Sequence, residues 1–418
     1  MRMTGHLTTL LLSMFALAGC GIQAQPTGPQ RATDSKEYAM PVTHPSADRD
    51  TDRLSHVRRE AGKVWIEGVA VRPTSQRASS VHGAQASILE CLGEDTTYED
   101  LVCYGGFAFR VGWHEQGCPS AGHPCCGYMC VARSDEAVPW TITRYDSFPW
   151  DVKKMSAEEV TARQAEIRAA VKDSIDRGVP VHVQAEEDGL IVGYADDGAR
   201  WLCLHPYHQG GREMYWYDQA QGFAGGPDQW PWVVQIMTGP KPPAARRSDR
   251  ELTTAALQQA VAMWHSPDAH EHHYYCGDKA YEKWLGWLRS VEAGDVADPR
   301  SGMQGNGWCF DVLIQSRRIA GPWLRQKAHL FSGETQRAIL LAADHYDKIA
   351  PLCLEGCVSP WDIALPPSKA DQWTSRVRQT QIIRLEAARQ HDAAAIAAIE
   401  AALSTLPADQ ASGRSAAP

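Results

Sequence analysis

The chain has 418 residues, of which 44% are hydrophobic and 22% charged, and its formal net charge is -9 at pH 7. This length and composition predict a globular protein of two ordinary domains with a well-buried core. The acidic balance supplies no basic surface for a phosphate backbone, so nucleic acid is excluded as an expected partner.

The N-terminal residues 1–20 have the features of an export signal. Arg2 precedes an apolar run over residues 7–17 that is too short to span a bilayer, and Leu17-Ala18-Gly19-Cys20 follows. The segment resembles a bacterial lipoprotein signal peptide, which implies cleavage before Cys20, a lipid anchor on its thiol and a place in the cell envelope. Gly21, where an inner-membrane retention signal would have Asp, favours the outer membrane. An ordinary buried helix with a chance cysteine is the alternative.

Residues 21–60 are rich in proline, threonine, serine and glutamine and show no hydrophobic period, so we expect a flexible tether to the membrane. The segment 79–111 then predicts two helices and a strand. Apolar side chains recur every three or four residues over 81–91, Thr97 and Asp100 form a capping box, and apolar residues alternate over 107–111.

A long helix follows, with a capping box at Ser156 and Glu159, and strand-like runs lie between residues 179 and 236. This order predicts an α+β domain over residues 61–240. Beyond a basic, proline-containing linker at 241–247 the hydrophobic spacing is helical, which predicts an all-α domain over 248–406. Asn306 is expected to cap one of its helices, and Cys309 to open a helix whose dipole would lower the thiol pKa, with core packing as the alternative. The polar tail, 407–418, is expected to be disordered.

Three stretches of the α+β part carry a family resemblance: His82–Leu92, Tyr98–Arg110 and Val179–Pro206. They resemble a papain-like cysteine fold of the bacteriocin-processing peptidase type and are more similar still to the acyltransferase family of butirosin biosynthesis. The resemblance covers residues 60–240. It implies helices followed by a largely antiparallel sheet, with the active site at the start of the first buried helix.

Such families use a cysteine nucleophile at the start of the central helix, a histidine base at the start of a strand and an aspartate that orients the histidine. Carried onto this sequence, the nucleophile falls on Gly83 or Ala84, the base on Glu187 or Asp188, and the orienting carboxylate on His205. None of these residue types suits its role, so the resemblance implies degenerate catalytic positions. The residues expected to line the remaining cleft are His82, Cys103, Phe107 and His182.

Eleven of the twelve cysteines lie beyond Cys20, in a chain expected outside the cytoplasm, where disulfides form. One or two disulfides are expected within a glycine- and proline-containing loop, and another local bridge near the C-terminal part. The cysteines concerned are Cys118, Cys125, Cys126 and Cys130 in the loop, then Cys353 and Cys357. Zinc is the alternative for the loop, although its vicinal pair does not match the usual two-residue spacing.

His270, His272 and His273 form a weak candidate for a divalent metal site, with a solvated loop as the alternative. No cofactor is expected. An acidic run at 186–188 would favour a cationic ligand, such as an amine or amino sugar, if it lines the cleft. We therefore expect a lipid-anchored binding or scaffolding protein on a non-catalytic papain-like domain. The alternative is a thiol-dependent peptidase, amidase or acyltransferase with a relocated cysteine.

Overall fold

The computed structural model describes residues 56–72, 78–128, 130–147, 149–184, 187–206, 214–218, 233–266 and 273–407. Cys20, the signal peptide and most of the predicted tether lie outside this range, as do His270 and His272. The last residues assigned to the tether, Val57–Glu60, form a strand rather than flexible chain. Residues 48–418 form one compact unit, so the expected linker at 241–247 lies inside that unit.

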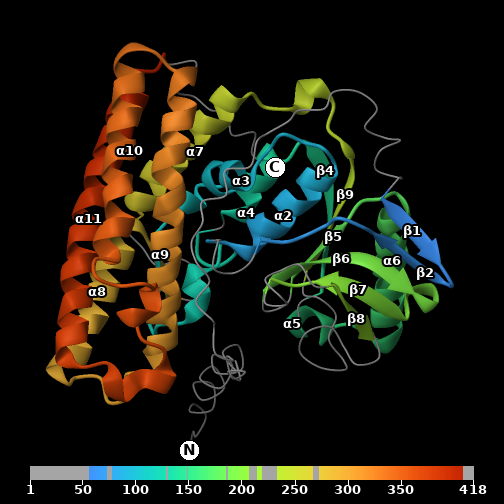
Figure 1. Ribbon diagram of the computed structural model, residues 1–418, viewed down its shortest axis with the longest axis horizontal. Helices are drawn as coiled ribbons and strands as arrows, with labels where there is room; N and C mark the ends of the chain where they lie inside the picture. The colour runs from blue at the N-terminus through green and yellow to red at the C-terminus, as the bar shows by residue number, and fades with distance from the viewer. Residues whose placement is uncertain are drawn as a thin grey trace, which may run out of the picture. The chain divides into compact units, whose positions relative to one another are not determined.

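The described residues contain an antiparallel sheet of eight strands in the order β1-β2-β6-β5-β9-β4, with β7 paired to β6 and β8 to β7 (Figure 1). Its strands are β1 (Val57–Glu60), β2 (Lys63–Ile66), β4 (Trp140–Asp146), β5 (Val181–Gln184), β6 (Asp188–Ala195), β7 (Arg200–Leu204), β8 (Met214–Asp218) and β9 (Val233–Pro240). Every residue of β5 and β6 is buried, so both faces of these strands are covered. A separate two-stranded sheet joins β3 (Gly112–His114) to β10 (Tyr274–Cys276).

Helices begin where the sequence places capping residues. Ser79 caps the buried helix α2, and capping boxes at Thr97/Asp100 and Ser156/Glu159 start α3 and α6 as predicted. The helices of this part are α2 (Ser80–Cys91), α3 (Tyr98–Tyr104), α4 (Val131–Ala137), α5 (Pro149–Val152) and α6 (Ala157–Asp176), with short 3₁₀ helices η2 (Phe107–Phe109), η3 (Pro119–Gly122) and η4 (Asp196–Gly198).

The C-terminal part is helical, as the spacing predicts, and its long helices α9, α10 and α11 lie side by side (Figure 1). Its helices are α7 (Asp249–Trp264), α8 (Gly277–Ala293), α9 (Arg300–Lys327), α10 (Gly333–Cys353) and α11 (Ser375–Ser404), with 3₁₀ helices η7 (Pro243–Ala245), η9 (Ala328–Leu330), η10 (Pro360–Asp362) and η11 (Pro367–Gln372). The fold class is α+β, as expected. No helix among the described residues is long and apolar enough to cross a membrane.

Two hydrophobic cores divide the molecule differently from the predicted domains. One lies under the large sheet and includes α2 and α6. The other fills the helical bundle but also takes in Tyr98, Phe107 and Trp113, from the part predicted to be α+β. The short elements α3, η2 and β3 therefore belong structurally to the helical core, which a boundary drawn from composition does not reveal.

Three local predictions were wrong. Residues 107–109 form the 3₁₀ helix η2 instead of a strand, because all three are buried and the chain turns after Gly106, which has a φ of 77°. Asn306 does not cap a helix but lies inside α9, where its Oδ1 accepts hydrogen bonds from Trp284 and Gln381. Cys309 likewise lies within α9, and burial raises the pKa of its thiol to about 12.

Candidate functional site

Polar side chains gather on one face of the central strands. Side chains alternate along a strand, so His182 and Gln184 of β5 point to the same side. Antiparallel pairing places Gln184 opposite Asp188 of β6, and His182 opposite Gln235 of β9. All four side chains are buried in a protein whose other strand positions here are apolar. Burial of so many polar groups needs mutual hydrogen bonds.

Asp188 is the centre of this group. Its Oδ1 lies 2.6 Å from Nε2 of His182, and its Oδ2 accepts a hydrogen bond from Ser80 Oγ at 2.9 Å and lies 3.1 Å from Nε2 of His123. Burial would raise the pKa of Asp188, but the hydrogen bonds and charges of His123 and His182 outweigh it and hold the pKa below its usual 3.8. Asp188 is therefore a buried carboxylate that bridges two imidazoles.

The beginning of α2 closes one side of the cluster. Ser79 accepts a hydrogen bond from the backbone N–H of His82, and its Oγ lies 2.8 Å from His82 Nδ1. Burial lowers the pKa of His82 to about 3, so this ring is neutral. Its Nε2 is buried without a hydrogen-bond partner among the described residues. The ring stacks at a tilt on Phe107, with centroids 5.8 Å apart.

His123 comes from the cysteine loop, which we define as residues 118–128. Arg110 organises this loop: its guanidinium donates to the carbonyl groups of Ala121, His123 and Cys126, each at 2.8 Å, and to that of Tyr128 at 3.1 Å. Four carbonyls on one buried guanidinium fix the path of a chain that has almost no secondary structure of its own. We call the residues joined around the carboxylate the Asp188 cluster: Ser80, His82, His123, His182, Gln184, Asp188 and Gln235.

The cysteine loop places two thiols beside His123. Its Nδ1 lies 3.2 Å from the backbone nitrogen of Cys125, and Cys126 follows directly in the chain. Burial opposes protonation of His123. The electrostatic influence of Cys125, together with that of Asp188 and Cys126, outweighs it and raises the pKa well above the usual 6.5.

The thiol of Cys126 responds in the opposite direction. Burial would raise the pKa of Cys126, but the influence of His123, the charge of Arg110 and the hydroxyl group of Ser120 lower it below the usual 9.0. Both Cys125 and Cys126 are partly exposed, and His123 keeps 17% of its side-chain surface accessible. Solvent therefore reaches both the His123 ring and the neighbouring Cys126 thiol.

This arrangement has the chemical parts of a thiol site: a sulfur with a lowered pKa, an imidazole that lowers it and a carboxylate 3.1 Å from the imidazole. It is not arranged as a metal centre. Within the described part of the chain, no three His, Cys, Asp or Glu side chains lie in positions that could hold a metal ion. His273, the described member of the predicted metal group, is exposed, and its Nδ1 lies 3.3 Å from Glu115 Oε2.

The structure brings together several residues that the resemblance singled out. Asp188 occupies the centre, His82 and His182 belong to its cluster, and Phe107 contacts both His82 and the guanidinium of Arg110. The Cδ2 atom of His205 would lie 3.6 Å from a Cβ added at Gly189, next to Asp188 in the chain. Gly83 and Ala84 are buried within α2. Glu187 is partly exposed.

Cys103 does not join this group. It is fully buried in the helical core, and burial with the charges of Asp100 and Glu99 raises its pKa well above 9.0. All eleven described cysteines are free thiols, so none of the suggested bridges is formed in this structure. The Arg384 guanidinium contacts the Cys353 carbonyl at 2.8 Å and Cys357 Sγ at 3.4 Å, and Cys130 is buried beside Met263. The sequence analysis considered Cys126 as a disulfide or zinc residue and did not single it out as a reactive thiol.

The sequence interpretation missed His123, Arg110 and Gln235. A histidine between cysteines in an aperiodic loop has no periodicity to reveal its partner. The signal that could have found the site is the presence of polar side chains at alternate positions of a buried strand: His182 and Gln184 interrupt an apolar run, which indicates a polar partner on the next element.

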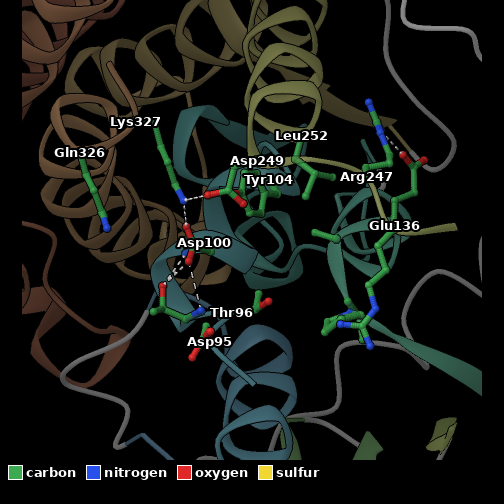
Figure 2. Close-up of a pocket in the computed structure, with 15 residues that line it drawn as sticks. Asp95, Thr96, Asp100, Tyr104, Glu136, Arg247, Asp249, Leu252, Gln326 and Lys327 are labelled. Carbon is green, nitrogen blue, oxygen red and sulfur yellow. Dashed lines mark hydrogen bonds and ion pairs between the residues drawn. The ribbon is translucent and has the colours of Figure 1, made fainter. Parts of the chain in front are cut away.

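A separate pocket of about 330 Å³ lies where α3, α4, α7 and the end of α9 meet (Figure 2). Lys327 reaches into it, with its Nζ 3.0 Å from both Asp100 Oδ1 and Asp249 Oδ2. Its charge is thus balanced by carboxylates of the protein. The residues that line this pocket are distinct from those of the Asp188 cluster.

Comparison with known proteins adds no assignment to this geometry: no protein-family profile matches the chain, and no curated protein sequence matches it significantly.

Proposed function

We propose that the protein is a thiol-dependent acyl-transfer enzyme in which Cys126 is the nucleophile, His123 the base and Asp188 the carboxylate that orients His123. The observation that carries the proposal is the position of His123. One ring nitrogen lies 3.1 Å from the buried carboxylate, and the other lies 3.2 Å from the backbone nitrogen of Cys125, next to Cys126, whose thiol pKa this ring lowers. Groups whose pKa values are shifted by burial together with specific charged partners are typical of reactive sites.

The reaction follows from these groups. The Cys126 thiolate attacks the carbonyl carbon of an amide, ester or thioester, and the imidazolium of His123 gives its proton to the leaving amine, alcohol or thiol. An acyl group remains on sulfur. His123, now neutral, takes a proton from water or an acceptor amine, which attacks the acyl carbon and regenerates the thiolate. Asp188 keeps its charge throughout and stabilises the imidazolium.

Gln184 is suited to stabilise the charge that develops on the carbonyl oxygen. Its amide nitrogen lies 3.9 Å from Cys125 Sγ and 3.4 Å from Nε2 of His123, and its side chain is buried. A fixed amide donor beside an attacked carbonyl contributes about 10²–10³ in rate in enzymes of this kind. We assign Gln184 that role.

The layout also supports the papain-like resemblance as a proposal. In that family the start of the central helix, the start of a strand and the residue before a proline converge on one site. Here Ser80 of α2 contacts Asp188 at the start of β6 at 2.9 Å, and the ring of His205 lies beside the following residue, Gly189. The three positions thus meet, with a carboxylate at the family's base position and the thiol supplied by a different loop.

We further propose that the enzyme is anchored by lipid at Cys20 in the cell envelope, on the strength of the lipobox and the apolar run that precedes it. Growth with a labelled fatty acid should label the wild-type chain and leave Cys20→Ala unlabelled and released from membranes. Equal labelling of both would refute the anchor without touching the thiol site.

The proposed reaction is tested with the full chain and a panel of small aryl esters and thioesters. We expect an acyl adduct, located by mass spectrometry, on Cys126 of the wild type. Cys126→Ser should lose the adduct, whereas the matched control Cys125→Ser, which removes the neighbouring thiol, should keep it. An adduct on Cys125 alone would move the nucleophile by one residue. Equal acylation of Cys126 in the wild type and in His123→Gln would show that His123 is not the base.

The non-catalytic reading makes the opposite prediction. A binding or scaffolding protein would give no acyl adduct at any cysteine of the loop and no substrate-dependent release of alcohol or thiol. It would still bind its ligand, and the acidic Asp188 region would favour a cationic one. Absence of adducts across the panel, with Cys126 freely alkylated by iodoacetamide, would support that reading.

A further inference from the structure

Two histidines outside the Asp188 cluster face each other across the long helices α10 and α11. Nδ1 of His345 lies 3.4 Å from Nδ1 of His391, and the two ring centroids are 5.7 Å apart at an interplanar angle of 43°. Both side chains are partly exposed, so solvent and small ions reach them. The pair therefore brings two nitrogen donors from different helices to one place at the surface.

The separation of the two nitrogens suits a shared metal ion better than a hydrogen bond. An ordinary hydrogen bond from an N–H group spans about 2.7–3.2 Å, whereas these nitrogens are 3.4 Å apart. Zinc–nitrogen bonds are about 2.0–2.1 Å long, and two of them at the tetrahedral angle place their nitrogens about 3.3–3.4 Å apart. At the right angles of octahedral or square-planar coordination the separation would be about 2.8–3.0 Å. The observed spacing matches two ligands of one tetrahedral ion.

The residues that follow these histidines in the chain hold the two helices together. Tyr346 is fully buried, and its ring lies against Phe109 and the guanidinium of Arg317. Asp392 is also buried, and both its carboxylate oxygens accept hydrogen bonds from Arg317. Arg317 thus contacts the neighbour of each histidine and fixes α10 relative to α11 at this level. Ligands on such rigid elements need little rearrangement to bind a metal ion.

Both imidazoles are in the form that binds a metal ion at neutral pH. Burial and the charge of Lys348 lower the pKa of His345 below the usual 6.5, against the opposing charge of Asp344. Burial and the charges of His345 and Lys348 lower the pKa of His391, against the opposing charge of Asp392. The rings are therefore neutral at pH 7, and with its proton on Nε2 each ring presents the Nδ1 lone pair to a cation.

We propose that His345 and His391 bind one divalent transition-metal ion of the zinc or cobalt type through their Nδ1 atoms and that the ion joins α10 to α11. Among the described residues no third His, Cys, Asp or Glu side chain joins them in a position to hold the ion, so water fills the remaining positions. Structural zinc sites have four protein ligands, so a site with two exchanges its ion more readily. Metal binding at this pair does not depend on the proposed thiol chemistry.

The first test is equilibrium dialysis of the full-length chain against zinc, with the accessible thiols alkylated beforehand because thiolates also bind zinc. We expect the wild type to bind one equivalent more than either His345→Ala or His391→Ala. His329→Ala is the matched control, since it removes an exposed histidine whose Nδ1 contacts the carbonyl group of Gln326, and it should bind as the wild type does. Equal binding by all these proteins would overturn the site. Loss in only one of the two variants would refute the pairing.

Cobalt and urea provide two further measurements on the same proteins. Cobalt(II) held by two imidazoles and water should give visible absorption that both variants lose, without the near-ultraviolet charge-transfer band of a cobalt–thiolate bond. Zinc should raise the urea midpoint of the wild type more than that of either variant, because only the folded wild type presents both ligands together. A thiolate band that survives both substitutions, or equal zinc-induced shifts in all the proteins, would place the metal elsewhere and overturn the proposal.

Discussion

His123 Nε2 lies 3.1 Å from Asp188 Oδ2, although 65 residues separate them in the chain. This contact links an irregular loop to the first residue of a buried strand, and it converts a run of cysteines into a candidate reaction centre. The contribution of this contact to the proposed reaction depends on the charge of Asp188, on the conformation of the cysteine loop and on the helices that pack against the loop.

Removing the charge of Asp188 tests the first dependence. In Asp188→Asn the amide keeps the size of the side chain, but His182 and His123 lose their shared carboxylate. We expect acylation of Cys126 to fall about 10³–10⁴-fold, as loss of the orienting carboxylate does in comparable triads. Glu187→Gln makes the same change one residue earlier on a partly exposed side chain and should leave the rate within about twofold.

The same carboxylate should make stability depend on pH in the acid range. The pKa of Asp188 is held below its usual 3.8 in the fold, so its contribution is complete above that value and is lost as pH falls through the folded-state pKa. Urea unfolding followed at several pH values should show wild type losing more stability than Asp188→Asn on acidification below about pH 4. Parallel curves would show that Asp188 is not ionised in the fold.

Reactivity of the Cys126 thiol should have its own pH profile. The pKa of Cys126 is lowered below 9.0 and that of His123 is raised well above 6.5, so the thiolate of Cys126 forms at a lower pH than that of an ordinary thiol. Iodoacetamide should therefore alkylate Cys126 faster at about pH 7 than it alkylates an ordinary thiol, which is protonated there. In His123→Gln the rate should fall at that pH and recover as pH rises toward 9.0. A pH profile identical in both proteins would show that His123 does not activate the thiol.

The local elements of this protein follow from its sequence, whereas its site does not. The caps at Thr97 and Ser156 and the apolar spacing of α2 act within a few residues, so their pattern is readable along the chain. His123 and Asp188 meet only because the sheet and the cysteine loop pack together. Asn306 shows the same limit: a residue typical of helix caps is buried within α9 because Trp284 and Gln381 satisfy it.

Arg110 should be required for the path of the cysteine loop. Replacing it with methionine removes the donors of four hydrogen bonds and leaves the carbonyl groups of Ala121, His123, Cys126 and Tyr128 without that partner. Each unsatisfied buried group costs about 1–3 kcal/mol, so the free energy of unfolding should drop by several kcal/mol and the fast alkylation of Cys126 should be lost. Arg133→Met, which removes only a surface ion pair with Glu136, should change stability by less than about 1 kcal/mol.

Close approach of α9 to the cysteine loop gives a subtler test. A Cβ added at Gly305 would overlap the carbonyl oxygen and carbon of Gly117, next to Cys118, and backbone cannot yield as a side chain does. Gly305→Ala should therefore displace the loop, destabilise the protein by about 1–3 kcal/mol and slow the alkylation of Cys126. Gly286→Ala in α8 is the matched control: no atom lies within 4 Å of its added Cβ, and it should be neutral or stabilise by up to about 1 kcal/mol. Equal effects of the two would mean that α9 does not position the loop.

The buried ion pair of Arg317 and Asp392 connects α9 and α11, and Arg317 also contacts the segment that carries Arg110. Arg317 donates to both Asp392 oxygens at 2.7 Å and also to the backbone carbonyls of residues 108–110, from which the Arg110 side chain extends into the cysteine loop. Asp392→Leu leaves the buried guanidinium of Arg317 without its carboxylate partner. It should lower the free energy of unfolding by about 3–5 kcal/mol in urea titrations. The double variant Arg317→Met/Asp392→Leu removes both charges and should recover much of that loss, because an apolar pair leaves no charge unsatisfied. Its Cys126 should nevertheless alkylate more slowly than in the wild type, since the carbonyls of residues 108–110 have lost their donor. Recovery of stability together with wild-type alkylation would show that α11 stabilises the fold without positioning the thiol.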